Sequence, residues 1–254
     1  MGSSAGAAGA EAIEQELRAL GTQERAAHEK AYLKSDLEFT GTAVPAIRSV
    51  VRSWRRRQPG LDHDGLVAVT RQLWARPVHE CRMAAAELLT ADGPLLDAAD
   101  IGLVEGMLRT ARTWALVDGL AANVTGDLVL RYPELTATLD RWAADQDFWI
   151  RRSAMLALLV PLRQGAGDFE RFSRYADQML TEKEFFIRKA IGWILRETAK
   201  RRPDLVAQWL APRVQLASGV TVREAVKPLP APVRDQLLAG YRAKHPVAVP
   251  PVSR

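Results

Sequence analysis

The chain has 254 residues, of which 48% are hydrophobic and 26% charged, and its 35 basic residues slightly exceed its 30 acidic ones. This length allows a substantial buried core, and the sequence contains no apolar run long enough to span a bilayer. The single cysteine, Cys81, excludes an intramolecular disulfide, and the four histidines are scattered along the chain. We therefore predict a cytoplasmic protein with no metal site and no cofactor.

The chain begins with ten residues rich in Gly, Ala and Ser, and we predict that residues 1–10 are disordered. Residues 11–244 are expected to form a single domain, because the breaks within them are short turns, such as 91–94, rather than linkers. The tail 245–254 contains several prolines and is also predicted to be disordered.

Between these ends, apolar residues recur at three- and four-residue spacing, which is typical of helices, and strand-like alternation is nearly absent. Five of six similar segments contain an apolar residue followed by Arg, and the six positions lie 34 to 37 residues apart. A period in that range on helical sequence is typical of stacked helix pairs. We predict an all-α fold, an α-solenoid of about six helix-pair repeats with a concave basic groove. The six positions are Ile47-Arg48, Cys81-Arg82, Leu116-Val117, Ile150-Arg151, Ile187-Arg188 and Val222-Arg223.

The repeated arginine has a structural interpretation, as a side chain that ties one repeat to its neighbour. Two longer basic stretches indicate a charged surface. Residues 48–57 contain five arginines and no acid, and residues 182–202 contain seven bases against three acids. One such stretch alone is typical of a solvated helix face, but two in one helical array also favour a groove that binds a polyanion.

The third repeat departs from the others, because Val117 stands where the others carry Arg. Trp114 and Asp118 flank this position and are four residues apart, so on a helix they share one face. A tryptophan is usually a core residue, but the carboxylate of Asp118 disfavours a dry core. We therefore predict that Trp114 and Asp118 lie on a solvent or groove face, opposite the apolar Leu116 and Val117.

Two later repeats contain further candidate residues. Trp193 follows Gly192, which lacks a side chain and so permits a close approach. Arg152 is additional to the repeated pattern, whereas Arg151 fits it. A change of one residue in the register would exchange these two arginines.

Three segments carry a resemblance to a known family: residues 113–118 (TWALVD), 148–154 (FWIRRSA) and 183–197 (KEFFIRKAIGWILRE). They resemble the AlkD-like DNA alkylation repair proteins, which are HEAT-like-repeat DNA glycosylases. The resemblance extends over residues 28 to 228. It implies a monofunctional DNA-alkylpurine glycosylase that excises positively charged N3- and N7-alkylated purines, such as 3-methyladenine and 7-methylguanine, from duplex DNA.

The resemblance also implies roles for single residues. Asp118 would stabilise the oxocarbenium-like transition state and position water, while Trp114 and Trp193 would pack on the sugar as further catalytic residues. Arg152 would hold a backbone phosphate. Tyr32 would contact DNA, although it has an alternative interpretation as a packing residue. The complete set of expected DNA-binding residues is Arg152, Tyr32, Lys189 and Arg188.

A non-catalytic helical-repeat scaffold that binds DNA or protein is the alternative function, because most helix-pair arrays are binding platforms. The expected partner is duplex DNA containing alkylated purines, bound by a monomer that associates with the nucleoid and not with a membrane. Excision with the damaged base flipped out of the helix and excision with the base left in place are both compatible with these residues.

Overall fold

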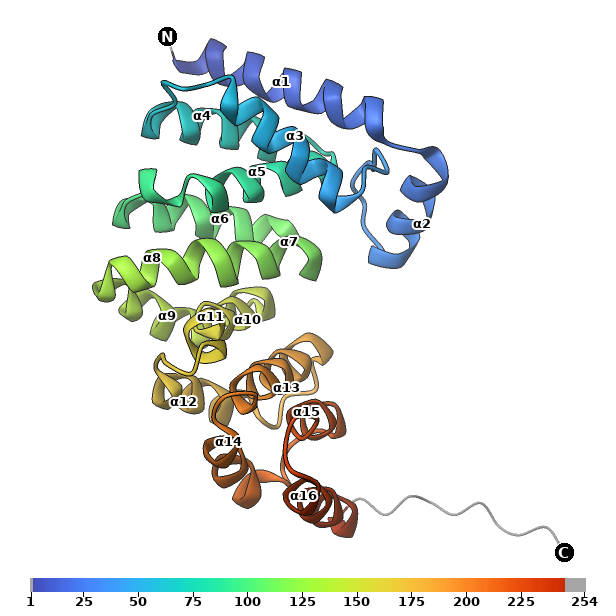
Figure 1. Ribbon diagram of the computed structural model, residues 1–254, viewed down its shortest axis with the longest axis vertical. Helices are drawn as coiled ribbons and strands as arrows, with labels where there is room; N and C mark the ends of the chain where they lie inside the picture. The colour runs from blue at the N-terminus through green and yellow to red at the C-terminus, as the bar shows by residue number, and fades with distance from the viewer. Residues whose placement is uncertain (1, 245–254) are drawn as a thin grey trace, which may run out of the picture. The chain divides into compact units, whose positions relative to one another are not determined.

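Helices account for nearly all regular structure in the computed structural model, which describes residues 2–244 (Figure 1). Within these residues the only β contact is one isolated bridge between Glu38 and Val78. The all-helical fold predicted from the sequence is therefore confirmed. The predicted disorder of 245–254 lies outside the described residues.

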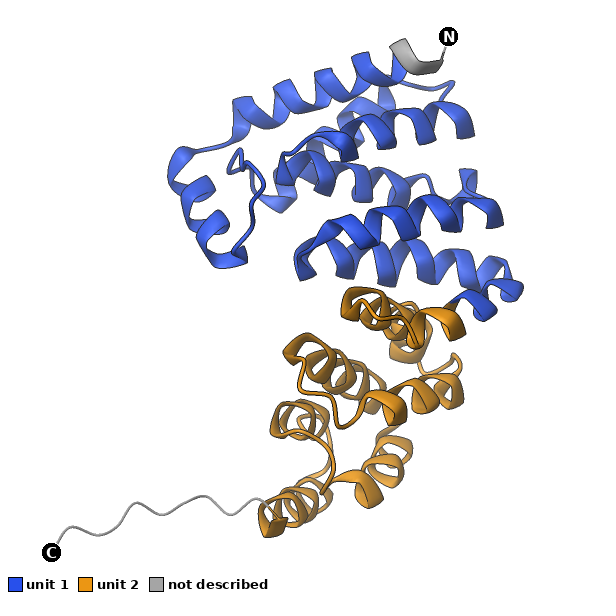
Figure 2. Cartoon of the chain, turned by 180° about the vertical axis from the view of Figure 1, so that it is seen from behind, with its two compact units in different colours: residues 1–138 blue, residues 139–254 orange. Residues whose placement is uncertain are grey.

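The chain divides into two compact units, residues 1–138 and 139–254 (Figure 2). The single domain expected over 11–244 stays a prediction. The helices up to the boundary are α1 (Gly2–Leu20), α2 (Gln23–Leu33), α3 (Val44–Arg56), α4 (His63–Ala75), α5 (His79–Ala91), α6 (Ile101–Ala111), α7 (Trp114–Gly119) and α8 (Gly126–Arg131). The remaining helices are α9 (Thr136–Ala143), in which the boundary falls, α10 (Phe148–Leu156), α11 (Leu159–Arg163), α12 (Phe169–Met179), α13 (Phe185–Ala199), α14 (Pro203–Leu210), α15 (Gly219–Ala225) and α16 (Ala231–Lys244).

The six repeated sequence positions occupy equivalent places in the structure. Each pattern lies in the first five residues of one helix, namely α3, α5, α7, α10, α13 and α15. The apolar member is buried in all six cases, with at most 1% of its surface exposed. In the first unit α5 packs against both α3 and α7, and in the second α13 packs against both α10 and α15. The sequence period therefore marks the helices that stack on one another.

Two of the repeated arginines agree with the structural interpretation. Arg48 forms a salt bridge with Glu87 of α5 at 2.9 Å, and Arg151 pairs with Glu182, just before α13, at 2.7 Å. Each therefore connects its own helix to the next repeat. Arg188 instead donates to the backbone carbonyl of Glu182 at 2.6 Å, close to the start of its own helix.

Cys81, the apolar member of the second pattern, is completely buried in α5. Burial raises the pKa of its thiol to about 12. The side chain therefore behaves as a small apolar core residue rather than as a thiolate.

The N-terminal segment differs from the prediction. Residues 2–10 are not disordered but form the first half of α1, which packs on α3, α4 and α5. A Cβ added to Gly6 would lie 2.9 Å from the Cβ of Ala68, and one added to Gly9 would lie 2.8 Å from Cζ2 of Trp54. The small residues that suggested disorder by composition allow α1 to approach α3 and α4 closely.

The connection between α2 and α3 is held by a buried carboxylate. Glu80, in the first turn of α5, has no solvent exposure. Its carboxylate accepts hydrogen bonds from the backbone N–H groups of Thr40, Gly41 and Thr42, at 2.9, 2.7 and 3.3 Å. The Thr42 hydroxyl donates to the carbonyl of Leu17 in α1 at 2.6 Å. Segment 38–42 is thereby fixed between α1 and α5.

The cores of the two units are mainly aliphatic and aromatic. Leu66 and Leu73 of α4 are fully buried in the first unit, and Trp142 and Phe172 are fully buried in the second. Across residues 2–244, no helix combines the length and the apolar composition needed to cross a membrane.

The packing of α1 can be tested by enlarging Gly9. We expect Gly9→Val to lower the free energy of unfolding by about 1–3 kcal/mol, because its side chain would overlap Trp54. Gly106→Val is the matched control, because Gly106 also lies within a helix but has no atom within 4 Å of an added Cβ. Thermal unfolding of both variants measures the difference. Equal melting temperatures would contradict the observed packing of residues 2–10.

Candidate functional site

The helix α7 separates polar and apolar side chains as the sequence predicted. Trp114 and Asp118 are half-buried, whereas Leu116 and Val117 between them are fully buried. The first turn of α7 follows the extended residue Thr113. After Asp118 the helix widens into a π-helical stretch, Leu120–Thr125, a local geometry that is frequent at functional sites.

Tyr32 lies beside Trp114, although 82 positions separate them in the sequence. The two ring centroids are 6.2 Å apart and the rings meet edge to face at 89°. Tyr32 nevertheless remains 67% exposed. The packing interpretation and the binding interpretation of Tyr32 are therefore compatible, because the ring contacts Trp114 with one part and faces solvent with another.

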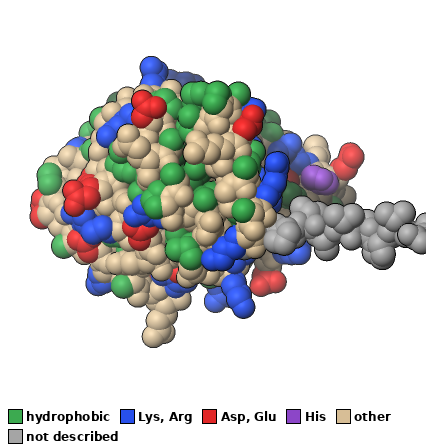
Figure 3. Space-filling view, turned by 90° about the horizontal axis from the view of Figure 1, so that it is seen from below, with side chains coloured by type: hydrophobic (Ala, Val, Ile, Leu, Met, Phe, Trp, Pro, Cys, Tyr) green, Lys and Arg blue, Asp and Glu red, His purple; other side chains and the backbone are tan. Residues whose placement is uncertain are grey.

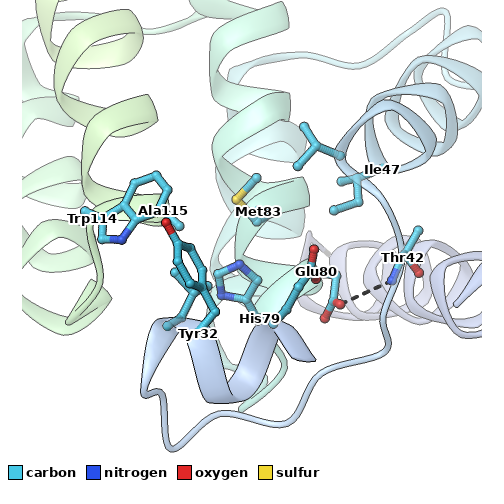
Figure 4. A pocket seen from close by; sticks show the side chains of 11 residues that line it. Tyr32, Thr42, Ile47, His79, Glu80, Met83, Trp114 and Ala115 are labelled. Carbon is cyan, nitrogen blue, oxygen red and sulfur yellow. Dashed lines mark hydrogen bonds between the residues drawn. The ribbon is translucent and has the colours of Figure 1, made fainter. Parts of the chain in front are cut away.

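A pocket of about 220 Å³ opens beside this pair of rings (Figure 4). Figure 4 shows Tyr32 reaching it from α2, Trp114 from α7, and Met83 and His79 from α5. Most of the lining is apolar. Its volume is below the range of about 300–1,000 Å³ that is typical of pockets for drug-sized ligands. The pocket therefore suits a small group rather than a whole nucleotide.

His79 is the unusual group of this apolar pocket. Only 5% of the residue is exposed, and its ring stacks on Phe39 with centroids 4.6 Å apart. Its Nδ1 atom is buried and has no hydrogen-bond partner. Burial lowers the pKa of His79 to about 4, and the charge of Glu80 opposes this shift while that of Arg82 adds to it. At neutral pH the imidazole is uncharged.

In the second unit, the structure places Arg152 in a buried position. Only 3% of the residue is exposed, and its guanidinium donates to the backbone carbonyl of Phe186 at 2.5 Å. The neighbouring Arg151 is half-buried and paired with Glu182. Arg152 therefore joins α10 to α13, and its predicted contact with a phosphate stays a prediction.

Trp193 is half-buried on α13, and Gly192 beside it has a packing role. A Cβ on Gly192 would lie 2.8 Å from the Cβ of Glu224 and 3.0 Å from the carbonyl oxygen of Thr221. The close approach expected at Gly192 is thus made by α15. The structure gives no ligand-related reason for this glycine.

The basic stretch 182–202 is partly neutralised. Lys189 and Lys227 each form a salt bridge with Glu224, at 2.9 and 2.8 Å, and Arg196 pairs with the same carboxylate. Burial alone would raise the pKa of Glu224, but hydrogen bonds from Lys227 and Lys189 and the nearby positive charges lower it to about 2. Acidic and basic side chains are also interspersed on the face drawn in Figure 3. Lys189 therefore has a structural partner already.

One group among the described residues could bring metal ligands together. Ligand atoms of His63, Asp97 and Asp100 lie within 4.8 Å of one another. Asp100 accepts a hydrogen bond from the backbone N–H of Asp97 at 2.9 Å, and it is 3.1 Å from Nε2 of His63. These contacts cap the turn before α6 and account for the cluster without an ion.

Comparison with known proteins decides the family. The sequence model of the DNA alkylation repair enzymes matches residues 13–229, which is most of the chain. The chain belongs to the DNA alkylation repair enzyme family. A search of curated proteins found no match.

Solved structures share the fold of this DNA alkylation repair family member. One is described as a predicted DNA alkylation repair enzyme from Enterococcus faecalis; it is 21% identical, with a TM-score of 0.74 over 83% of this chain and 97% of the other. AlkD2 from Streptococcus mutans is 17% identical, with a TM-score of 0.57 over 82% and 99% of the two chains. The protein smu.31 from Streptococcus mutans UA159 gives the same identity and TM-score over 82% and 98%.

The roles predicted for single residues of this DNA alkylation repair family member stay predictions. The structure brings Tyr32 and Trp114 together in the first unit, as described above. His79 and Glu80, which line the pocket beside these rings, were not among the residues predicted from the sequence. The available signal was an adjacent His-Glu pair at the start of a helix that is otherwise rich in apolar residues.

The buried imidazole predicts an acid-dependent loss of stability. The unfolded chain binds a proton at His79 near the ordinary pKa of 6.5, whereas the folded chain does so only near pH 4. The free energy of unfolding should therefore fall as the pH drops through this window, by up to about 3 kcal/mol. His79→Phe keeps an aromatic ring against Phe39 and should make the decline shallower.

Chemical denaturation of the two proteins at several pH values measures this effect. Replacing the exposed His28 by Phe is the control. In this variant the free energy of unfolding should fall with decreasing pH as it does in the wild-type protein. If His79→Phe and the wild-type protein lose stability in parallel between pH 6.5 and pH 4, the neutral state of the buried imidazole is wrong.

Proposed function

We propose that this DNA alkylation repair family member is a monofunctional DNA glycosylase that excises positively charged N3- and N7-alkylated purines from duplex DNA. The observation that carries the proposal is the arrangement of α7. A carboxylate and an indole share its half-exposed face, and a largely exposed tyrosine extends the aromatic surface. Family membership supports DNA alkylation damage as the substrate class.

The chemistry requires few protein groups. A purine alkylated at N3 or N7 already carries a positive charge, so it can leave as a neutral base without being protonated first. The electron pair of the C1′–N bond goes to the base, and positive charge develops on the deoxyribose. Water then adds to C1′, and its proton passes to the carboxylate or to solvent. The rate depends on stabilising the cationic sugar.

Asp118 is the residue proposed to stabilise this cation and to orient the water. It lies one helical turn from Trp114, so a sugar against the indole face would be within reach of the carboxylate. The π electrons of Trp114 favour the same positive charge. Trp193, on α13 of the second unit, is kept as a further proposed catalytic residue. A cytoplasmic location in contact with nucleoid DNA follows from this function.

The proposal is tested by the Asp118→Asn variant. We expect release of 7-methylguanine from methylated duplex DNA to slow by a factor of about 100 or more, because the amide cannot offset the charge that develops on the sugar. Affinity for undamaged duplex should stay equal or increase slightly, since one negative charge is removed. Single-turnover base release and fluorescence anisotropy measure the two quantities.

Asp64→Asn is the matched control, because Asp64 on α4 has a 94% exposed side chain and its replacement changes the net charge equally. It should release base at the wild-type rate. Equal release by the wild-type protein and Asp118→Asn would refute the catalytic role of Asp118. If the wild-type protein binds DNA but releases no base above the spontaneous rate, the non-catalytic scaffold is the correct function.

A further inference from the structure

A second pocket of the first unit, of about 380 Å³, lies between segment 34–37 and the C-terminal end of α6. We refer to it as the cationic pocket. In contrast to the pocket of Figure 4, polar and charged side chains form much of its lining. The side chains that matter for its charge and hydrogen bonding are Lys34, Ser35, Asp36, Arg82, Thr110 and Arg112.

The three cations of this pocket lack acidic partners. Among the described residues, Lys34, Arg82 and Arg112 form no salt bridge, unlike Arg48, Arg151 and the cations around Glu224. Asp36 supplies one negative charge, which leaves a surplus of two positive charges around the pocket. Like charges that converge on an open space repel one another, so an anion placed between them would be stabilised.

Arg82 is only partly satisfied within the protein. One terminal nitrogen donates to the carbonyl of Thr110 at 2.9 Å, and the guanidinium lies 5.2 Å from the ring centroid of Trp74. Its Nε atom is buried and has no partner. Burial and the charge of Arg112 lower the pKa of Arg82. A buried N–H donor without an acceptor is costly, and an anionic oxygen would satisfy it.

The backbone on both sides of the cationic pocket is strained. Lys34 and Arg112 are the two residues other than glycine with positive φ in the described chain, at 49° and 51°. Each ends a helix, α2 or α6, in the left-handed conformation that favours glycine or asparagine at this position. Such conformations are energetically unfavourable and cluster at functional sites. Here they place a cation where a glycine would relieve the strain.

The cationic pocket adjoins the proposed site of base excision. Lys34 follows Tyr32 by two residues, Arg112 precedes Trp114 by two, and the rings of Tyr32 and Trp114 are in contact. Between Arg112 and Trp114, Thr113 is 3% exposed, and its hydroxyl oxygen is buried without a partner. A nucleotide against Trp114 would therefore have a neighbouring phosphate close to two cations.

We propose that the cationic pocket binds a phosphodiester of the DNA backbone, next to the nucleotide held against Trp114. The choice of DNA as the source of the phosphate rests on the proposed function. Lys34 and Arg112 supply exposed charges, and Arg82, which is held by its hydrogen bond to Thr110, supplies a further donor in the lining. The pocket fixes the register of the duplex on the first unit and carries no sequence preference.

The test measures binding of the full chain to undamaged duplex DNA by fluorescence anisotropy at several salt concentrations. A plot of log K against log[salt] has a slope of about −0.9 per phosphate neutralised. For the Lys34→Gln/Arg112→Gln double variant, this slope should be less steep by about 0.9, and binding at low salt should be several-fold weaker. Arg109→Gln is the control on α6, because Arg109 is already paired with Glu105 at 2.6 Å. It should keep the wild-type slope.

A second variant separates binding from folding. Arg112→Gly removes the cation and also relieves the left-handed strain, so its melting temperature should equal or exceed that of the wild-type protein while its DNA affinity falls. A folded Arg112→Gly variant that keeps the wild-type affinity and slope would overturn the proposal. So would a double variant with an unchanged slope.

Inorganic phosphate provides the remaining comparison. Phosphate at constant ionic strength could raise the melting temperature of the wild-type protein but not that of the double variant, while both proteins show the same salt slope for DNA. In that case the pocket binds a free anion, and the proposal of a DNA phosphodiester is wrong. The outcome is independent of catalysis. If the double variant has a less steep salt slope and the wild-type protein releases no base, the cationic pocket is supported and only the glycosylase activity is refuted. If the wild-type protein releases base and the double variant keeps the wild-type slope, the glycosylase activity is supported and the cationic pocket is refuted.

Discussion

Glu80 lies at the start of α5 without solvent exposure, and its carboxylate accepts hydrogen bonds from three consecutive backbone N–H groups of the connection between α2 and α3. Displacing this connection would leave a buried charge without partners, which is strongly unfavourable. The end of α2 is thereby held near α5, against which α7 also packs. Tyr32 and Trp114 can meet because both of their helices are positioned relative to the same helix.

The positive charges of this protein serve two different purposes. Many arginines and lysines, including Arg48, Arg151 and Lys189, form salt bridges that connect one repeat to the next. These charges are largely cancelled where they stand. The small net charge of +5 therefore says little about binding. The cationic pocket differs in that Lys34, Arg82 and Arg112 line it with one acidic residue, Asp36, and form no salt bridge among the described residues, so local pairing matters more than total charge.

The helical repeats and the two faces of α7 could be predicted from the sequence, because helices that bury one face have apolar residues at regular spacing along the chain. The contacts of Gly6 with Ala68 and of Arg152 with Phe186 could not, since they depend on which distant segments approach each other. The same holds for His79. Its neutral state results from burial by several helices, and a count of histidines contains no information on burial.

The burial of Cys81 has a consequence for survival under the damage that this family repairs. Electrophiles that methylate purines also attack sulfur, and the reactive form of cysteine is the thiolate. In this protein the only cysteine is enclosed in α5 and its pKa is raised to about 12, so at neutral pH almost none of it is ionised or accessible. The only cysteine of the chain is therefore a poor target for an alkylating agent, because it is neither exposed nor ionised.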